Sequence, residues 1–121
     1  MFDVQYDPDA NCLIIRVAGF WTVETVVALA KAVGSKGHEA QVIRDDFNVV
    51  VESFDFPVQA HDVADLLANI MRGGMTLTRG RTAVLVGSQL NKAQVERTLV
   101  HPRVRAFMTR EAAQDWLAGA G

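Results

Sequence analysis

The segment from Asn48 to Met71 constrains the fold more than any other part of the chain. It begins with three consecutive valines, Val49 to Val51, between polar residues, and such a run is typical of a strand that is covered on both faces. Pro57 interrupts the run, and an amphipathic stretch with apolar residues at helical spacing follows it. The segment therefore predicts a βα unit. The carboxyl end of its strand is the first place to look for a site.

The rest of the chain supplies further strands and helices in alternation. Apolar and polar residues alternate in 2–6, and an apolar-rich run follows at 12–17. The short turn between them is rich in Asp, Pro and Asn, which predicts an antiparallel hairpin with strands at 2–6 and 12–17. Apolar runs and patterns predict strands at 48–52, 81–87 and 104–108. Helical spacing and capping residues predict helices at 22–34, 59–71, 89–99 and 109–117, giving the order β-β-α-β-α-β-α-β-α.

Segment 35–47 leaves two interpretations open. Gly34 is a candidate C-cap for the first helix, and Gly37 a further break. The following residues fit a short helical continuation that ends near Asp45, and they also fit a strand that starts at Val42. We favour the helical continuation, because 48–52 is the better strand.

Composition limits the class of protein. The chain has 121 residues, 50% of them apolar and 21% charged, which predicts one globular domain, 1–121, with a core that needs no disulfide. The net charge of −2 gives no overall attraction for nucleic acid or anionic lipid. The charge is uneven, because nine acidic and four basic residues precede position 61, and five acidic and eight basic residues follow.

Cysteine content and apolar runs point to the compartment. Cys12 is the only cysteine, which excludes an intramolecular disulfide and a cysteine-based zinc site. The start has neither a basic nor an apolar signal region, and no apolar run approaches the roughly 18 residues of a membrane span. We therefore expect a cytoplasmic protein.

The pattern of elements resembles a SpoIIAA-like domain, the fold of the STAS domains of anti-sigma factor antagonists and anion-transporter tails. The resemblance rests on the opening hairpin, on VVVES running into FPVQAHDVADLL, on TAVLVGS opening a helix, and on the ending VRAFMTREAAQDWL. It is closest to small stand-alone bacterial members, which as a group have no assigned activity. It implies an α/β fold with a mixed four- to five-stranded sheet, helices mainly on one face, and a regulatory or binding role.

The antagonist members carry a phosphorylatable serine in an Asp-Ser-Ser-Gly-like loop before a helix. The corresponding residues here are Glu52 to Phe56, in which Ser53 is the only hydroxyl. No second serine or glycine follows it, and several residues, including Pro57, separate it from the helix. A phosphoswitch at this position requires an exposed Ser53 close to the amides of the helix N-terminus.

Other reactive side chains near this strand do not form a recognised set. Glu52, Asp55, His61 and Asp62 lie within eleven positions, and such groups can bind metals or transfer protons. Neighbouring residues of a helix diverge by about 100°, however, so His61 and Asp62 do not point to one site. We expect no metal, cofactor or catalytic site. Gly87 and Ser88, at a strand end before a helix, are a weak candidate anion site.

Four aromatic residues fall at junctions between strands and helices: Phe20, Trp21, Phe54 and Phe56. They fit a local core, a pocket or a protein contact. We expect a non-enzymatic module that binds an unknown protein partner through Phe20–Trp21 and Glu52–Phe56, with a homodimer as one possible assembly. The alternative is a carrier or sensor of a small apolar or lipid-like ligand. A cavity lined by Phe20, Phe54 and Phe56 would favour the carrier, and an exposed apolar patch would favour the module.

Overall fold

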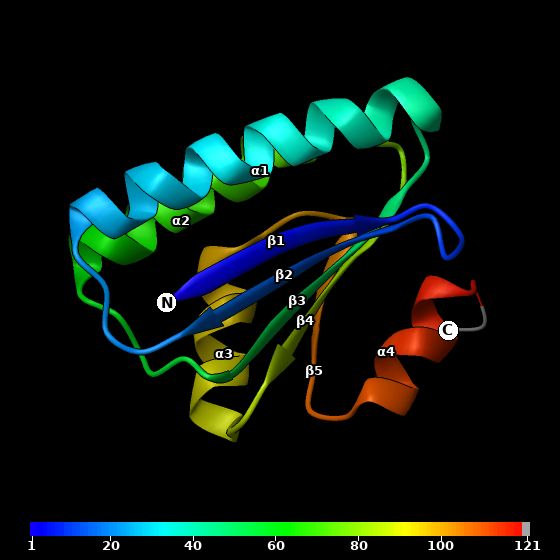
Figure 1. The fold of residues 1–121 in the computed structure, drawn as a ribbon. Coiled ribbons are helices and arrows are strands. Elements are labelled where there is room, and N and C mark those ends of the chain that lie inside the picture. The colour runs from blue at the N-terminus through cyan, green and yellow to red at the C-terminus, as the bar shows by residue number, and fades with distance from the viewer. Residues whose placement is uncertain (120–121) are drawn as a thin grey trace.

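The computed structural model describes residues 1–119, which form five strands and four helices in the predicted order (Figure 1). Three helices begin at a serine or threonine whose side-chain oxygen accepts a hydrogen bond from a backbone N–H three residues on, as predicted. In chain order the elements are β1 (Phe2–Asp7), β2 (Cys12–Ala18), α1 (Val23–Ile43), β3 (Asn48–Asp55), α2 (His61–Gly74), β4 (Thr82–Val86), α3 (Gln89–Thr98), β5 (Val104–Phe107) and α4 (Arg110–Leu117).

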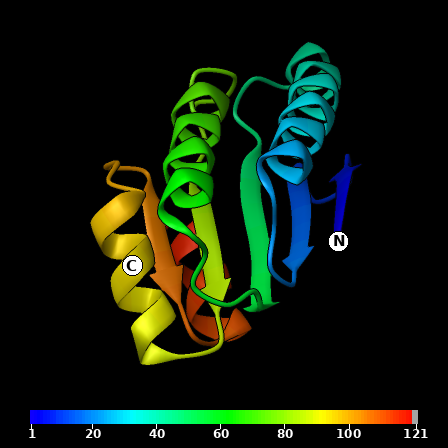
Figure 2. The ribbon, with the colours of Figure 1, turned by 90° about the vertical axis from the view of Figure 1, so that its left-hand side faces the viewer.

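The strands form one mixed sheet in the order β1-β2-β3-β4-β5. β1 and β2 are an antiparallel hairpin, and β2 to β5 pair in parallel. From β2 to β5, each parallel strand lies next to the previous one in the same direction across the sheet. Because crossover connections between parallel strands are right-handed, the connecting helices α1, α2 and α3 all lie on one face. Figure 2 shows these helices together, whereas α4 packs on the opposite face. The predicted α/β fold with helices mainly on one face is confirmed.

The main core lies between the sheet and helices α1 and α2. Residues of β2 alternate in burial, so that Leu13, Ile15 and Val17 face the helices. Full burial of such side chains stabilises the fold by about 1.5–3 kcal/mol each. A second cluster lies under α3, and a third joins Trp116 of α4 to Leu85 of β4.

The prediction that the first helix breaks at Gly34 and Gly37 was wrong. Helix α1 runs without interruption to Ile43, past both glycines. Gly37 is buried within the helix, where an added Cβ would lie 2.9 Å from Leu77 Cδ1. It is therefore a close-packing residue and not a break. The strand alternative at Val42 was wrong, because Val42 and Ile43 are exposed in the last turn of the helix.

Strand β3 is longer than predicted and ends at Asp55 instead of Glu52. Its last residues stay paired, since Ser53 lies opposite Val86 of β4 and Asp55 opposite Ala18 of β2. Most of the residues that we expected in a loop are therefore part of the sheet. Their side chains are fixed by the alternation of the strand.

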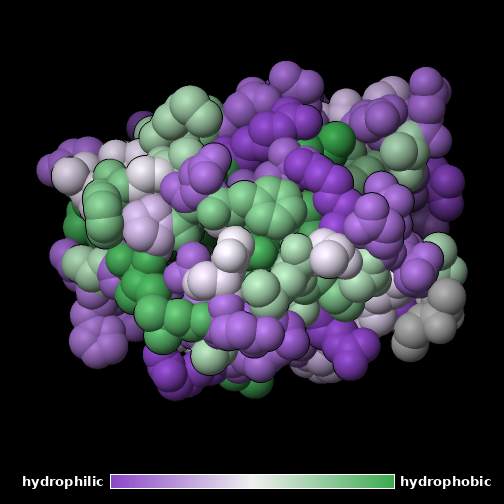
Figure 3. All heavy atoms as spheres, turned by 90° about the horizontal axis from the view of Figure 1, so that it is seen from below, coloured by the Kyte–Doolittle hydropathy of each residue, from purple (hydrophilic) through white to green (hydrophobic). Residues whose placement is uncertain are grey.

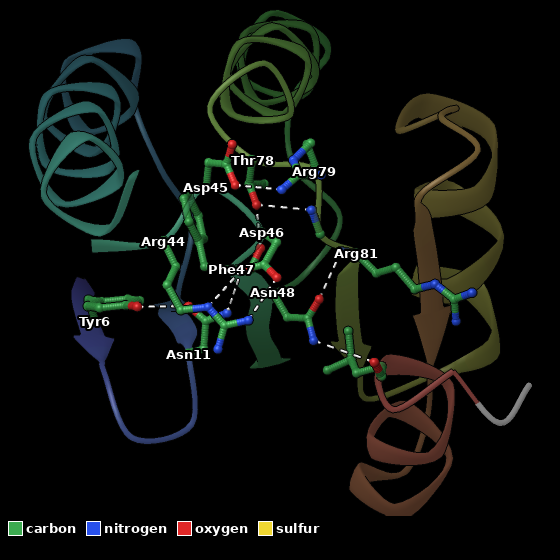
Figure 4. Close-up of polar contacts among 12 residues, drawn as sticks. Tyr6, Asn11, Arg44, Asp45, Asp46, Phe47, Asn48, Thr78, Arg79 and Arg81 are labelled. Carbon is green, nitrogen blue, oxygen red and sulfur yellow. Dashed lines mark hydrogen bonds and ion pairs between the residues drawn. The ribbon is translucent and has the colours of Figure 1, made fainter. Parts of the chain in front are cut away.

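Polar side chains tie the loops together at the amino ends of the parallel strands (Figure 4). Asn11, at a φ of 50° in the hairpin turn, donates to Asp46 Oδ1 at 3.1 Å and accepts from the Tyr6 hydroxyl at 2.8 Å. Arg79 pairs with Asp45 at 2.8 Å. These contacts join the hairpin turn, the α1–β3 loop and the α2–β4 loop. This edge of the sheet is thereby occupied by structural contacts.

Candidate functional site

The loops that follow β2, β3 and β4 meet at the opposite edge of the sheet. The backbone N–H of Gly19 donates to Asp55 O at 3.1 Å, and Asn91 Nδ2 donates to Phe56 O at 3.2 Å. The loops after β2 and β3 and the first turn of α3 are therefore held side by side. We name the exposed residues at this edge the carboxyl-end surface; it consists of Phe20, Phe54, Asp55, Val58 and Leu90.

Two of the four predicted aromatic residues, Trp21 and Phe56, form a local core beneath this surface. Trp21 is buried, and its Nε1–H donates to Ala18 O at 2.9 Å. Its ring stands edge-on to Phe56, with the centroids 5.1 Å apart. Such pairs contribute about 0.5–1.5 kcal/mol beyond their burial. Trp21 is therefore a support for the neighbouring exposed residues.

Gln59, which was not predicted as a site residue, fixes the geometry of the loops after β2 and β3. Its Oε1 accepts from the backbone N–H of Trp21 at 2.9 Å, and its Nε2 donates to Gly19 O at 3.0 Å and to Pro57 O at 2.7 Å. The residue is 8% exposed. Nothing in the sequence distinguishes it from an ordinary residue before a helix.

The other two aromatic residues, Phe20 and Phe54, are exposed. Phe20 is 81% exposed and Phe54 is 38% exposed. The guanidinium carbon of Arg110 lies 5.4 Å from the Phe54 ring centroid, within cation–π range. In Figure 3, which looks onto the face of the sheet opposite α1 and α2, apolar side chains gather at the left end and continue across the middle.

Glu52 is the centre of a charge network on that same face. Its carboxylate accepts from Arg16 Nε at 2.7 Å and from Arg110, and Arg16 also pairs with Asp3 at 3.3 Å. Burial raises the pKa of Glu52, but the hydrogen bonds from the two arginines outweigh it and leave that pKa below its usual value. Glu52 is therefore a structural anion that links β2, β3 and α4.

Ser53 lies on the opposite side of β3, inside the protein. It is 5% exposed, and its Oγ–H donates to Leu85 O at 2.6 Å. The condition for a phosphoswitch, an exposed hydroxyl near helix amides, is not met in this conformation. The site that we propose therefore does not include Ser53.

Gly87 and Ser88 lie close to the carboxyl-end surface. A Cβ at Gly87 would be 2.6 Å from Phe54 O, so the loop after β4 needs a glycine here to approach β3. The hydroxyl of Ser88 accepts from the backbone N–H of Asn91 at 3.1 Å and caps α3. This role accounts for both residues, and anion binding stays a prediction.

Reactive groups do not converge within residues 1–119. No three His, Cys, Asp or Glu side chains of this part of the chain gather closely enough to hold a metal ion. His61 and Asp62 are exposed at the start of α2. No helix in the same part of the chain has the length and the apolar character needed to cross a membrane.

An apolar cavity of about 160 Å³ lies between the sheet and helices α1 to α3. Its walls include Val51, Val84, Leu67 and Val95. Of the three aromatic residues named for a carrier, only Phe56 is in the wall. The cavity therefore belongs to the core, and neither Phe20 nor Phe54 lines it.

No protein-family model and no curated protein matches the sequence. The structure is similar to an uncharacterised protein of the DUF3478 family with a SpoIIAA-like fold from Shewanella loihica PV-4, at 14% identity and a TM-score of 0.69 over 97% of this chain and 92% of that one. It is also similar to the anti-sigma factor antagonist SpoIIAA in its unphosphorylated form, at 16% identity and a TM-score of 0.66 over 98% and 97%. These likenesses confirm the SpoIIAA-like fold.

Proposed function

We propose that this chain is a non-enzymatic regulatory module that binds a partner protein through the carboxyl-end surface. The observation that carries the proposal is the exposure of Phe20 and Phe54 beside a buried, hydrogen-bonded frame. Aromatic side chains held on a rigid support are favourable anchors for binding, because little conformational entropy is lost when a partner covers them. This geometry supports recognition of a partner protein.

The uncovered half of the sheet extends this surface. Parallel strands are normally covered on both faces. Within residues 1–119, α4 packs on β4 and β5 and reaches β3 at Val50, which packs against its cluster, and no helix covers the outer face of β2. Ile14 of β2 and Val50 are only partly buried. A partner protein docked on the carboxyl-end surface would extend naturally over these residues.

The likeness to an anti-sigma factor antagonist agrees with a regulatory role, although it is an analogy of fold. The proposal includes no phosphorylation of Ser53, because that hydroxyl is buried. In our proposal, binding is controlled by access to the carboxyl-end surface.

Photo-crosslinking in the native cells tests the proposal. A photoreactive phenylalanine analogue at position 20 is compared with the same analogue at position 42, because Val42 is 88% exposed but lies at the far end of α1. We expect a discrete crosslinked partner at position 20 alone, lost when Phe54→Ser is added. Equal crosslinking at both positions, or none at position 20, would contradict the proposal. A crosslink between two copies would identify a homodimer.

A carrier of a small apolar or lipid-like molecule is the alternative to this proposal, and the apolar cavity, which only Phe56 of the three named aromatic residues lines, is where such a molecule would bind. Native mass spectrometry of the protein from its own host distinguishes the two candidates. A bound molecule that is lost on denaturation would favour the carrier. Introducing Leu67→Trp to fill the cavity would then reduce the bound fraction, whereas Phe20→Ser would not.

A further inference from the structure

The outer edge of β5 carries unused backbone hydrogen-bonding groups. Among residues 1–119, β5 pairs only with β4. The N–H of Thr82 donates to Arg103 O at 2.8 Å, and the alternation of a parallel strand then directs the backbone of Arg105 and Phe107 toward β4. The N–H and C=O of Ala106 therefore point away from the sheet. Such an edge is a template for one more strand.

A groove of about 550 Å³ runs along this edge, and we name it the edge groove. Helix α3 contributes one wall with Val95 and Leu99, and Ala112 of α4 lies on the other side. All four residues of β5 line the groove between them. A four-residue extended segment is about 13 Å long. The groove thus lies along the strand edge, and its walls offer an added strand side-chain contacts on both faces.

The two faces of the groove differ in chemistry. The side chains of Val104 and Ala106 are buried toward the cluster under α3, whereas Arg105 is exposed on the α4 side. Arg105 forms no ion pair with a carboxylate of residues 1–119, and its guanidinium carbon lies 5.9 Å from the Trp116 ring centroid. An added strand alternates its side chains in the same way. It therefore meets apolar groups on one face and an uncompensated positive charge on the other.

The charge distinguishes between possible occupants. Lys92 and Glu96 in the groove wall lie 3.5 Å apart and compensate one another, so Arg105 supplies the net charge. A second copy of this chain that paired through β5 across a two-fold axis would bring its own Arg105 to the same face. An acidic segment would instead gain an ion pair there. The groove therefore favours an acidic segment over a second copy.

We propose that the edge groove binds an extended segment of another protein, which adds to β5 as a sixth strand. Its apolar side chains face Val95 and Leu99, and an acidic side chain faces Arg105. This surface is separate from the carboxyl-end surface, so the inference goes beyond the proposed function and does not depend on it.

The test uses a synthetic heptapeptide, Ser-Val-Glu-Val-Glu-Val-Ser, with blocked ends and a fluorescent label, and the same peptide with lysine in place of glutamate. Fluorescence anisotropy with the full chain measures binding. We expect the acidic peptide to bind at least about tenfold more tightly than the basic one, because like charges in contact are strongly unfavourable. Arg105→Glu is expected to reverse this preference. Arg97→Glu, an exposed charge reversal on α3 outside the groove, is the matched control and is expected to retain it.

A backbone control separates strand addition from simple charge attraction. Peptides N-methylated on the valines alone or on the glutamates alone block opposite edges of the added strand. We expect one pattern to abolish binding and the other to retain it. Ala106→Pro removes the outward N–H of β5 and is expected to abolish binding as well. Circular dichroism checks that each variant is folded, and if Ala106→Pro is not, the methylated peptides carry the test.

Three outcomes would overturn the inference. The first is binding of the acidic peptide weaker than about 1 mM. The second is an equal loss for Arg97→Glu and Arg105→Glu, or equal binding of both methylated peptides. The third is a dimer in sedimentation experiments that Arg105→Glu disrupts, which would assign the edge to a second copy of the chain.

Discussion

Replacement of Ser53 measures how strongly the sheet disfavours a charge at the position where the sequence resemblance suggested a phosphoswitch. Ser53→Ala removes the 2.6 Å hydrogen bond to Leu85 O, and loss of a buried hydrogen bond costs about 1–2 kcal/mol. Ser53→Asp, a mimic of the phosphorylated state, places a carboxylate at a site that is 5% exposed and faces a carbonyl oxygen. An uncompensated buried charge costs about 3 kcal/mol or more.

Urea unfolding followed by circular dichroism at pH 7 gives both free energies. Ser35→Asp is the matched control, because Ser35 is exposed on α1, and we expect its effect to stay within about 0.5 kcal/mol. We also expect the penalty of Ser53→Asp to shrink at low pH, where the carboxyl group is neutral. A Ser53→Asp protein as stable as Ser35→Asp would refute this reasoning, and would mean that the strand opens readily enough for modification.

Three further predictions concern the stability and reactivity of the fold. Gly80→Ala is expected to lower the unfolding free energy by about 3 kcal/mol, because its Cβ would lie 2.1 Å from Phe47 O. Gly73→Ala has open space around its Cβ and is expected to stabilise the protein by about 0.5 kcal/mol; thermal unfolding compares the two variants. Burial, with a smaller contribution from a nearby carboxylate, raises the pKa of the Cys12 thiol to about 11, so alkylation at pH 8 should be about a hundredfold slower in the native protein than in urea. The folded-state pKa of Glu52 is lowered, so its contribution to stability is present above its unfolded pKa and is lost as pH falls through the folded value. The stability difference between wild type and Glu52→Gln should therefore shrink from pH 7 to about pH 3 in urea titrations.

Periodicity was enough to predict the sheet and most of the helices. The continuous apolar run 83–86 predicts a buried strand, and all five residues of β4 are buried. The end of α1 did not follow, because Gly37 reads as a break unless Leu77, forty positions away, is known to pack against it. A glycine that allows close packing and a glycine that ends a helix look the same in one sequence.

The sequence predicted where the candidate site lies, but not which of its side chains are exposed and which are buried. Nothing in the sequence distinguishes Phe20 from Trp21 as the buried residue. The hydrogen bonds of Gln59 to this loop hold it in the conformation in which Trp21 is buried. A usable signal existed for Ser53 and Phe54: extending the alternation of β3 past Val51 places the serine inside and the phenylalanine outside. We did not extend the alternation because we expected the strand to end at Glu52 and a loop to follow.

Helix α4 stands alone on its face, and the cluster that holds it is separate from the main core. The guanidinium carbons of Arg81 and Arg105 lie 5.0 and 5.9 Å from the ring centroid of its Trp116. Because α4 packs through a small separate cluster, we expect it to open at a lower free energy than the sheet with its three crossover helices. Amide hydrogen exchange would register the two as separate cooperative units.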